Sequence, residues 1–443
     1  MSRTKTVPNV NWLPDLRPRK IMLAVMPYEG EVRDKVTDKF YKNSAVKYMP
    51  LGVLSIAACI PDCYEVKVLD AASRGLTLEE TITEIEAFAP DVLGLSVVTY
   101  RAWSMVQILK RCSAPVKVVG GPHATKSSAY ILEQGADAVF IDDAEVTFPK
   151  WLADGCPKGV FDGGQADLNA LPLPARNLLN KEDYYIEHND DLLFDVGRLR
   201  LPVFTSKGCP FSCIYCDVQQ KVFNFKSPER VAEEFKDLVA YGATSIHILD
   251  DAFNIRKNRV IGISQVLAEQ GIDIDWSARG TVEVREEVIA ELAAAGCKRL
   301  HVGIESLDDG VLQNLKKAQR YKHIETFANH CAKHGIDILG YFIMGAPGET
   351  EAYRQKLPQM IADLGIRIPY FNILSPLAET PYYSQLLKEG RFERDHWDDF
   401  NREPVKDFIM PDVRPAEERA MLEATIVDYV SYFKQRDMHV FAA

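Results

Sequence analysis

The sequence predicts an α/β protein that contains an N-terminal doubly wound (flavodoxin-like) parallel sheet, a partial (β/α)6 barrel and a helical C-terminal region. Two series of short, β-branched apolar runs alternate with helical patterns, which is typical of parallel sheets covered by helices. A stretch rich in Pro, Asn and Asp separates the two series and indicates an inter-domain connection. We therefore expect a first domain over residues 1–155, a linker over 156–200, a barrel over 201–380 and a helical region over 381–443.

The first series contains five predicted strands, and the helical patterns between them cover both faces of the sheet. Five strands of this kind suit a flavodoxin-like domain, whose ligand lies at the carboxyl ends of the strands. The strands are expected at residues 20–27, 64–70, 91–98, 116–121 and 137–141, with helices at 49–60, 76–88, 101–112 and 128–136.

The second series contains six predicted strands. Six β/α units fall short of the eight in a closed barrel, so the sheet should form an open or partial barrel. The strands are expected at residues 201–208, 244–250, 274–280, 299–306, 338–345 and 369–376, and helices include 228–242, 259–271 and 285–296. Beyond about residue 381 the pattern is helical and charged.

Composition excludes several classes of protein. The chain has 443 residues, of which 47% are hydrophobic, so it has the apolar content for packed cores and is neither disordered nor fibrous. No apolar run approaches the ~18 residues that a membrane span needs, and the polar, proline-broken N-terminus lacks the apolar stretch of a signal peptide. The formal charge of −11 argues against bulk nucleic-acid binding. We expect a cytoplasmic protein without a membrane span or a nucleic-acid partner.

Three of the nine cysteines form a cluster in the sequence. Six are scattered and are interpreted as small buried hydrophobic residues, whereas Cys209, Cys213 and Cys216 form a C-x3-C-x2-C loop directly after the first strand of the second series. Three thiolates can hold three irons of a cubane cluster and leave the fourth iron open to a substrate or cofactor. Structural zinc is the main alternative, but it requires four ligands, and no further His/Cys pair of the usual spacing follows.

This loop resembles the signature of the radical S-adenosylmethionine (radical SAM) superfamily, including the aromatic residue Tyr215 before the last cysteine. The resemblance implies a [4Fe-4S] cluster, held by the three cysteines, whose open iron chelates SAM. It also implies reductive cleavage of SAM to methionine and a 5′-deoxyadenosyl radical, which abstracts a hydrogen from the substrate. The difficult chemistry then belongs to the cofactor, while the protein supplies orientation and excludes water.

Polar residues at other strand ends are candidates for binding SAM, because the carboxyl ends of parallel strands share one edge. Asp250 and Asp251 occupy the position of the family's common Gly-Gly-Glu motif, which contacts the SAM amino group. The sequence leaves open which of the two aspartates points inward. Arg279 suits the SAM carboxylate. Glu305 and Ser306 suit the ribose hydroxyls, and the backbone from Gly345 onward suits adenine. A helix cap or a surface ion pair is the alternative for each residue.

The order of the two domains resembles the cobalamin-binding branch of this superfamily, and the likeness covers roughly residues 20–380. It implies that cobalamin lies against small and hydroxyl residues at the strand ends of the first domain. Two features depart from the common pattern: Asp142 and Asp143 replace a glycine-containing run, and no Asp-x-His-x-x-Gly motif is present. His123 is interpreted as a loop-packing residue. The candidate cobalamin-binding residues are Ser96, Thr99, Gly120, Gly121, Thr125 and Glu145.

The first hypothesis is a radical SAM enzyme that uses cobalamin to methylate an unactivated carbon of a small-molecule metabolite. The second keeps the radical chemistry without cobalamin and ends in dehydration, decarboxylation or rearrangement. The third is a non-catalytic iron–sulfur electron-transfer protein, which explains the polar strand ends poorly. Tyr341, Asn372 and Glu379 are candidate substrate-facing positions. The chemistry implies a reductant such as flavodoxin or ferredoxin.

Overall fold

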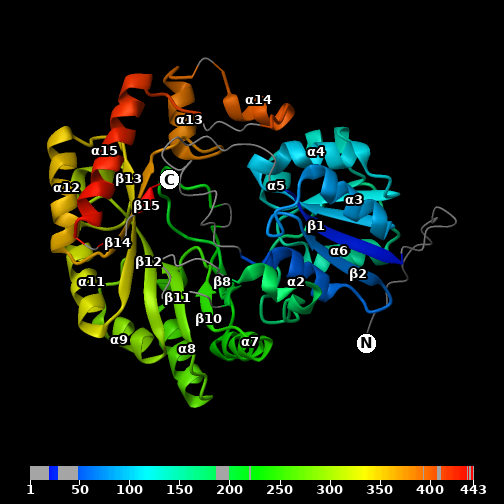
Figure 1. Cartoon of the computed structure of the whole chain (residues 1–443), viewed down its shortest axis with the longest axis horizontal. Coiled ribbons are helices and arrows are strands. Elements are labelled where there is room, and N and C mark those ends of the chain that lie inside the picture. Colours follow the sequence, from blue (N-terminus) through cyan, green and yellow to red (C-terminus); the bar gives the residue numbers. More distant parts are fainter. Residues whose placement is uncertain are drawn as a thin grey trace, which may run out of the picture. The chain divides into compact units, whose positions relative to one another are not determined.

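The computed structural model describes residues 19–27, 48–185, 199–218, 221–392, 394–406, 411–436, 438 and 441–442. Its contacts divide the chain into two compact units. Unit 1 comprises Met1–Val32, Pro50–Asp183 and Asp398–Phe408, and unit 2 comprises Arg33–Met49, Tyr184–Trp397 and Ile409–Ala443. Each unit is built on its own parallel sheet (Figure 1).

Unit 1 contains a six-stranded parallel sheet in the order β2-β1-β3-β4-β5-β6. The first five strands have the flavodoxin-like order, so this part of the predicted fold class is confirmed. The strands are β1 (Lys20–Val25), β2 (Glu65–Asp70), β3 (Val92–Ser96), β4 (Val116–Gly120), β5 (Ala138–Ile141) and β6 (Gly159–Asp162). The helices are α2 (Leu51–Cys59), α3 (Leu78–Phe88), α4 (Ala102–Arg111), α5 (Pro122–Glu133) and α6 (Ala144–Ala153), with short 3-10 turns at Thr99–Arg101, Arg176–Leu178 and Lys181–Tyr184.

Two local features of unit 1 differ from the expectation. Strand β6 lies within the expected linker, where it pairs in parallel with β5. It is an edge strand that is nowhere fully buried, so its apolar signal is weak. Helix α5 begins at Pro122 rather than residue 128, because proline at the first helical position is pre-organised for a helix, and a non-helical φ/ψ pair at Ser127 interrupts it.

Unit 2 contains a seven-stranded parallel sheet in the order β15-β14-β13-β12-β11-β10-β7. Six strands follow one another in chain order, as the partial-barrel prediction requires, and the short β15 adds to the β14 edge. The strands are β7 (Arg200–Val203), β10 (Ser245–Ile248), β11 (Asp275–Gly280), β12 (Cys297–Glu305), β13 (Asp337–Met344), β14 (Ile368–Ile373) and β15 (Phe441–Ala442), with a separate antiparallel pair β8 (Ser206–Lys207) and β9 (Asn224–Phe225).

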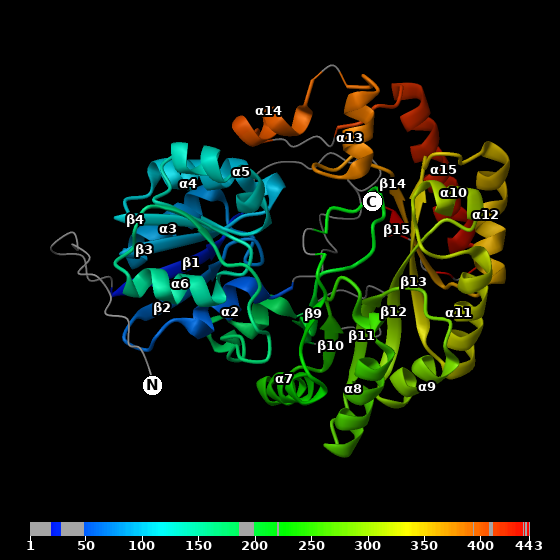
Figure 2. The same ribbon diagram turned by 180° about the vertical axis from the view of Figure 1, so that it is seen from behind.

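Helices cover one face of the unit 2 sheet (Figures 1 and 2). Trp276 of β11 packs edge-on against Phe235 of α7, and Phe371 of β14 packs against Phe433 of α15. Because side chains alternate along a strand, residues next to these lie on the opposite, inner face. The helices of unit 2 are α7 (Pro228–Tyr241), α8 (Lys257–Glu269), α9 (Glu286–Ala294), α10 (Asp309–Asn314), α11 (Tyr321–His334), α12 (Glu351–Asp363), α13 (Pro381–Lys388) and α15 (Ala416–Lys434). Helix α14 (His396–Arg402) lies mostly in the segment Asp398–Phe408 of unit 1.

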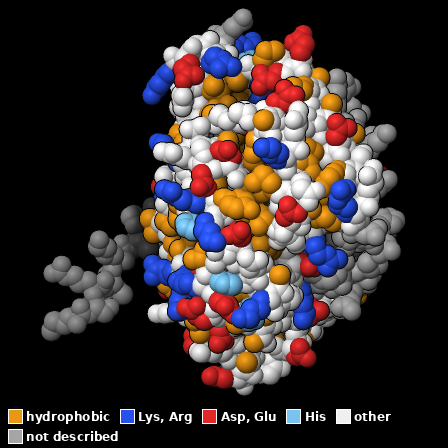
Figure 3. All heavy atoms as spheres, turned by 90° about the vertical axis from the view of Figure 1, so that its left-hand side faces the viewer, with side chains coloured by type: hydrophobic (Ala, Val, Ile, Leu, Met, Phe, Trp, Pro, Cys, Tyr) orange, Lys and Arg blue, Asp and Glu red, His pale blue; other side chains and the backbone are white. Residues whose placement is uncertain are grey.

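The outer face of unit 2 carries acidic and basic side chains intermixed with small apolar areas (Figure 3). Basic residues do not form a continuous field on this face, which agrees with the acidic balance of the chain. Among the described residues, the helices are all too short or too polar to cross a membrane.

Candidate active site

The cysteine loop follows the first strand of unit 2 and is anchored at its centre. Ile214 is buried; its N–H donates to the Leu315 carbonyl over 3.1 Å, and its carbonyl accepts from the Tyr382 N–H over 2.9 Å. The loop is therefore tied to the segment after α10 and to the start of α13. Cys209, Cys213 and Cys216 are free thiols of intermediate exposure around this anchor. The predicted position of the loop, at the carboxyl edge of the sheet, matches the structure.

The three thiols suit an iron–sulfur cubane, because each thiolate of such a cluster binds a different iron. In the described ranges, no group of three or more His, Cys, Asp or Glu side chains converges on one ion position. Burial raises the pKa of Cys209 and of Cys216 above the ordinary thiol value, so these thiols are protonated at neutral pH. Metal binding would require that they lose their protons.

Tyr215, Glu305 and Lys317 form a linked group beside the cysteines. The Tyr215 hydroxyl donates to Glu305 Oε1 over 2.8 Å, and Lys317 Nζ lies 3.1 Å from the same oxygen. Burial lowers the pKa of Lys317, but the charges of Glu305, Cys213 and Cys216 outweigh it and raise the pKa overall. Lys317 is therefore a cation beside the cysteines, with its side chain 15% exposed, where it could offset the negative charge of a cluster.

The two aspartates after β10 have different environments. Asp250 is fully buried, and its carboxylate accepts from the Thr205 N–H (2.6 Å) and from the hydroxyls of Thr205 and Ser206 (both 2.5 Å). Because the Thr205 N–H bonds to this carboxylate and not to a neighbouring strand, the predicted strand 201–208 is split into β7 and β8. Asp251 is exposed, and its Oδ2 accepts from the Gly208 N–H over 2.9 Å, next to the first cysteine.

The other predicted strand-end residues lie at the same edge of the sheet. Arg279 is exposed at the end of β11. The Ser306 hydroxyl is engaged, since it donates to Tyr353 Oη over 2.9 Å and accepts from the Asp308 N–H over 3.1 Å. The Gly345 N–H donates to Glu349 Oε2 over 2.7 Å, so this amide is already paired within the protein.

In unit 1 the ends of β3 and β4 lie together. A β-carbon on Gly121, where φ is +99°, would lie 2.7 Å from the Val97 carbonyl and 3.3 Å from Ser96 Oγ. The Val97 N–H donates to the Gly120 carbonyl over 2.9 Å. Only glycine fits this approach, so the two strand ends come together with backbone rather than side chains between them. Thr99 lies in the 3-10 turn after β3 and Thr125 in α5, both half-buried.

The acidic residues after β5 differ in burial and in their partners. Asp143 is buried, and its Oδ2 accepts from the Ala166 N–H over 3.0 Å, so its carboxylate is used inside the unit. Asp142 is exposed with a left-handed φ of +57°, a backbone conformation that glycine adopts more readily. Glu145 is buried, and its charge contributes, after burial, to the raised pKa of Cys59 on α2. Glu145 of α6 is therefore near enough to Cys59 of α2 for their charges to interact.

Sequence reasoning missed Lys317 and a set of polar residues on the inner face of the unit 2 sheet. A single lysine 12 residues after Glu305 carries no sequence signal. The inner-face set could have been predicted from the sequence, because its polar members occupy alternate positions within otherwise apolar strands. The set comprises Arg200, His247, Ser277, Arg299 and His301.

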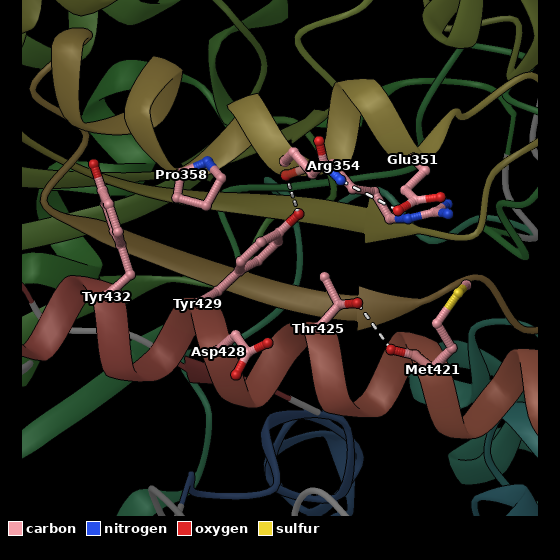
Figure 4. A pocket seen from close by; sticks show the side chains of 9 residues that line it. Glu351, Arg354, Pro358, Met421, Thr425, Asp428, Tyr429 and Tyr432 are labelled. Atoms are coloured by element: carbon pink, nitrogen blue, oxygen red, sulfur yellow. Dashed lines mark hydrogen bonds between the residues drawn. The ribbon is translucent and has the colours of Figure 1, made fainter.

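A pocket of about 380 Å³ lies between α12 and α15 (Figure 4). Across it, the Tyr429 hydroxyl donates to the Arg354 carbonyl over 2.6 Å. Because α15 packs on the helix-covered face of the sheet through Phe433 and Phe371, this pocket lies on the outer side of unit 2. It does not belong to the site at the strand ends.

The fold, the three-cysteine loop and the polar strand ends together define a radical SAM enzyme. Residues 203–361 match the Radical SAM superfamily model, and residues 41–152 match the B12 binding domain model. The chain belongs to the radical SAM superfamily, in the branch with an N-terminal B12 binding domain.

Proteins similar to the chain include named methyltransferases. A Pyrococcus horikoshii protein named an uncharacterized methyltransferase is 28% identical over 85% of this chain and 85% of that protein. The bacteriochlorophyllide d C-12(1)-methyltransferase of Chlorobaculum tepidum is 24% identical over 84% of this chain and 81% of that protein. The structure of the radical SAM methyltransferase TsrM from Kitasatospora setae, with cobalamin and a [4Fe-4S] cluster bound, has a TM-score of 0.64 and 16% identity, covering 84% of this chain and 78% of that one.

Proposed function

We propose that this chain is a cobalamin-dependent radical SAM methyltransferase that acts on a small molecule. The observation that carries the proposal is the anchored, half-buried thiol loop, which has Asp251 on one side and the Glu305–Lys317 pair on the other. A B12 binding domain precedes it in the chain, and the names of the relatives support methyl transfer.

When bound, a [4Fe-4S] cluster and cobalamin would supply an electron for SAM cleavage and a carrier for the methyl group. Cys209, Cys213 and Cys216 would each hold one iron. Asp251 would face the SAM ammonium group, a role supported by its second carboxylate oxygen, which has no hydrogen bond among the described residues. Lys317 and Arg279 would bind the SAM carboxylate, while Glu305 would orient Tyr215.

In unit 1, the residues at the ends of β3 and β4 would hold cobalamin. Ser96, Gly120 and Gly121 fit this role because they lie close together and carry no bulky side chains. They would offer backbone groups and one hydroxyl to the cofactor. Thr99 and Thr125 would offer further hydroxyls. Glu145 would act by holding α6 against α2, since its carboxylate is buried.

The test is anaerobic expression with cobalamin, reconstitution of the cluster, and product analysis with SAM and a reductant. We expect iron–sulfur and corrinoid absorbance, 5′-deoxyadenosine, and S-adenosylhomocysteine once a substrate is present. Cys213→Ala should abolish 5′-deoxyadenosine formation, whereas Cys63→Ala, the same change at an exposed cysteine of unit 1, should not. Unchanged 5′-deoxyadenosine formation by Cys213→Ala would contradict the radical chemistry, and a lack of corrinoid bands would contradict the methyl transfer.

The reductant would be a flavodoxin or ferredoxin, because a one-electron donor of low potential is needed. The cytoplasm is the expected compartment, since a loop of three free thiols persists only under reducing conditions.

A further inference from the structure

The inner face of the unit 2 sheet carries a buried layer of polar side chains formed by Arg200, His247, Ser277 and His301. These residues come from β7, β10, β11 and β12, and between 0% and 8% of each is exposed. Strand register places His247 beside Ser277, and His301 beside Arg279. We call these four residues the inner-face layer.

The layer is held together by its own hydrogen bonds. Arg200 Nη2 lies 2.9 Å from Ser277 Oγ and 2.9 Å from His247 Nδ1, and the latter two atoms are 2.6 Å apart. The His247 and His301 ring centroids are 4.7 Å apart, and Tyr48 stacks on His247 at 5.6 Å. The side chains are thus fixed relative to one another.

The positive charge of this layer has no protein counter-ion among the described residues. Both acceptors of Arg200 are neutral groups, whereas the neighbouring Arg299 is paired with Asp337 at 3.4 Å. Arg279, at the end of β11, makes no ion pair within the described ranges. Burial and the nearby arginines hold the pKa of His247 and of His301 well below the ordinary value, so both rings are neutral. Burying an uncompensated guanidinium is costly.

Two polar atoms in the layer have no partner. Arg200 Nε and His301 Nε2 are buried without a hydrogen bond in the described structure. Such orphaned groups cost about 1–3 kcal/mol each and are rare in native proteins unless a ligand or water completes them. An anion would satisfy the Arg200 donor and compensate its charge at once.

We propose that the inner-face layer binds a carboxylate or phosphate group of the substrate, so that the enzyme acts on a small acidic molecule. This inference rests on the proposed function. The layer adjoins the proposed SAM site, because Arg279 lies beside His301. From there it extends deeper into the sheet, to Arg200 at the start of β7, so that it can hold a different group.

The test is calorimetric titration of the reconstituted full chain with inorganic phosphate and with acetate. We expect one anion per chain and at least tenfold weaker binding in Arg200→Met and in His301→Gln. The matched control is Arg367→Met, which removes an arginine directly before β14 that pairs with Asp337 at 3.6 Å outside the layer. Anion binding by this variant should stay within twofold of the wild type. Tighter phosphate binding would indicate a phosphate ester, and tighter acetate binding a carboxylate.

Three results would overturn the proposal. They are no saturable binding of either anion by the wild type, equal weakening in Arg367→Met, and displacement of the anion by SAM added without reductant. The last result would assign the layer to the SAM carboxylate. If Arg200→Met does not fold, His301→Gln decides. Since 5′-deoxyadenosine is measured separately, anion binding without SAM cleavage would refute the proposed function, and cleavage without anion binding would refute only the substrate class.

Discussion

The Tyr215 hydroxyl donates to Glu305 Oε1 over 2.8 Å and thereby ties the cysteine loop to the end of β12. Glu305 reaches this position through a left-handed φ of +65° at an irregularity in the register of β12. A β-carbon on Gly303 would lie 2.3 Å from the same carboxylate oxygen and 2.9 Å from Lys317 Nζ. The geometry of the cysteine loop thus depends on a strained residue and on a missing side chain.

Tyr215→Phe should weaken the loop without removing a cysteine. It deletes one hydrogen bond to a charged acceptor, which is worth about 1.5–3 kcal/mol. We expect a lower free energy of unfolding in urea and fewer irons per chain after reconstitution. Tyr432→Phe is the control, because its hydroxyl donates to Gln359 at the exposed surface. Equal stability and iron content in Tyr215→Phe and wild type would show that the bond does not hold the loop.

Gly303→Ala should disrupt the Glu305–Lys317 pair, since the added methyl group occupies the place of the carboxylate. Because the atoms in the way are the ends of flexible side chains that can move aside, we expect a cost at the low end of the about 1–3 kcal/mol typical of overpacking. The control is Gly52→Ala in α2, where nothing lies within 4 Å of the new methyl group and helix propensity favours alanine. Thermal unfolding measures both. A Gly303→Ala variant as stable as Gly52→Ala would contradict the packing seen around Glu305.

Asp250→Asn and Asp251→Asn should have different consequences. Asp250 anchors Thr205 and Ser206, and burial raises the pKa of Asp250 even though Arg259 lies near it. We expect Asp250→Asn to lower the unfolding free energy by about 1–3 kcal/mol. Asp251→Asn should leave stability unchanged and weaken SAM binding, measured by equilibrium dialysis. Tight SAM binding by Asp251→Asn would remove this residue from the proposed site.

His123 should make unit 1 sensitive to acid. Burial, with a smaller effect of Lys126, lowers the pKa of His123 to about 4, and neither ring nitrogen has a partner in the described structure. Between pH 6.5 and 4 the unfolded chain binds a proton that the folded chain does not. Stability present above pH 6.5 is therefore lost as the pH falls towards 4, by up to about 3 kcal/mol.

His123→Gln should flatten this part of the stability profile. Urea unfolding from pH 7.5 to 4 measures it, with the exposed His323→Gln as the control. The same pH dependence in His123→Gln and wild type would assign the acid sensitivity to other groups. Since residue 123 follows Gly120 and Gly121, bound cobalamin should also alter the profile if it contacts the ring.

Much of the fold and part of the site were predictable from local patterns. The apolar runs located five strands of unit 1 and six of unit 2, because buried parallel strands are continuously hydrophobic. Strand β6 and the start of α5 were missed, since an edge strand and a proline-initiated turn carry little apolar signal. The assignment of Ser306 and Gly345 to the ribose and adenine remains a prediction.

The two sheets, the branch of the superfamily and the three cysteines could be predicted from local sequence, because hydrophobic period and motif spacing are properties of neighbouring residues. Which aspartate is free for a ligand depends on tertiary contacts, since Asp250 is engaged by residues 44 and 45 positions away. The tertiary structure also places Lys317 beside Glu305 and brings polar residues from four strands into one layer. Such juxtapositions depend on how strands pair in three dimensions, and no local pattern encodes them.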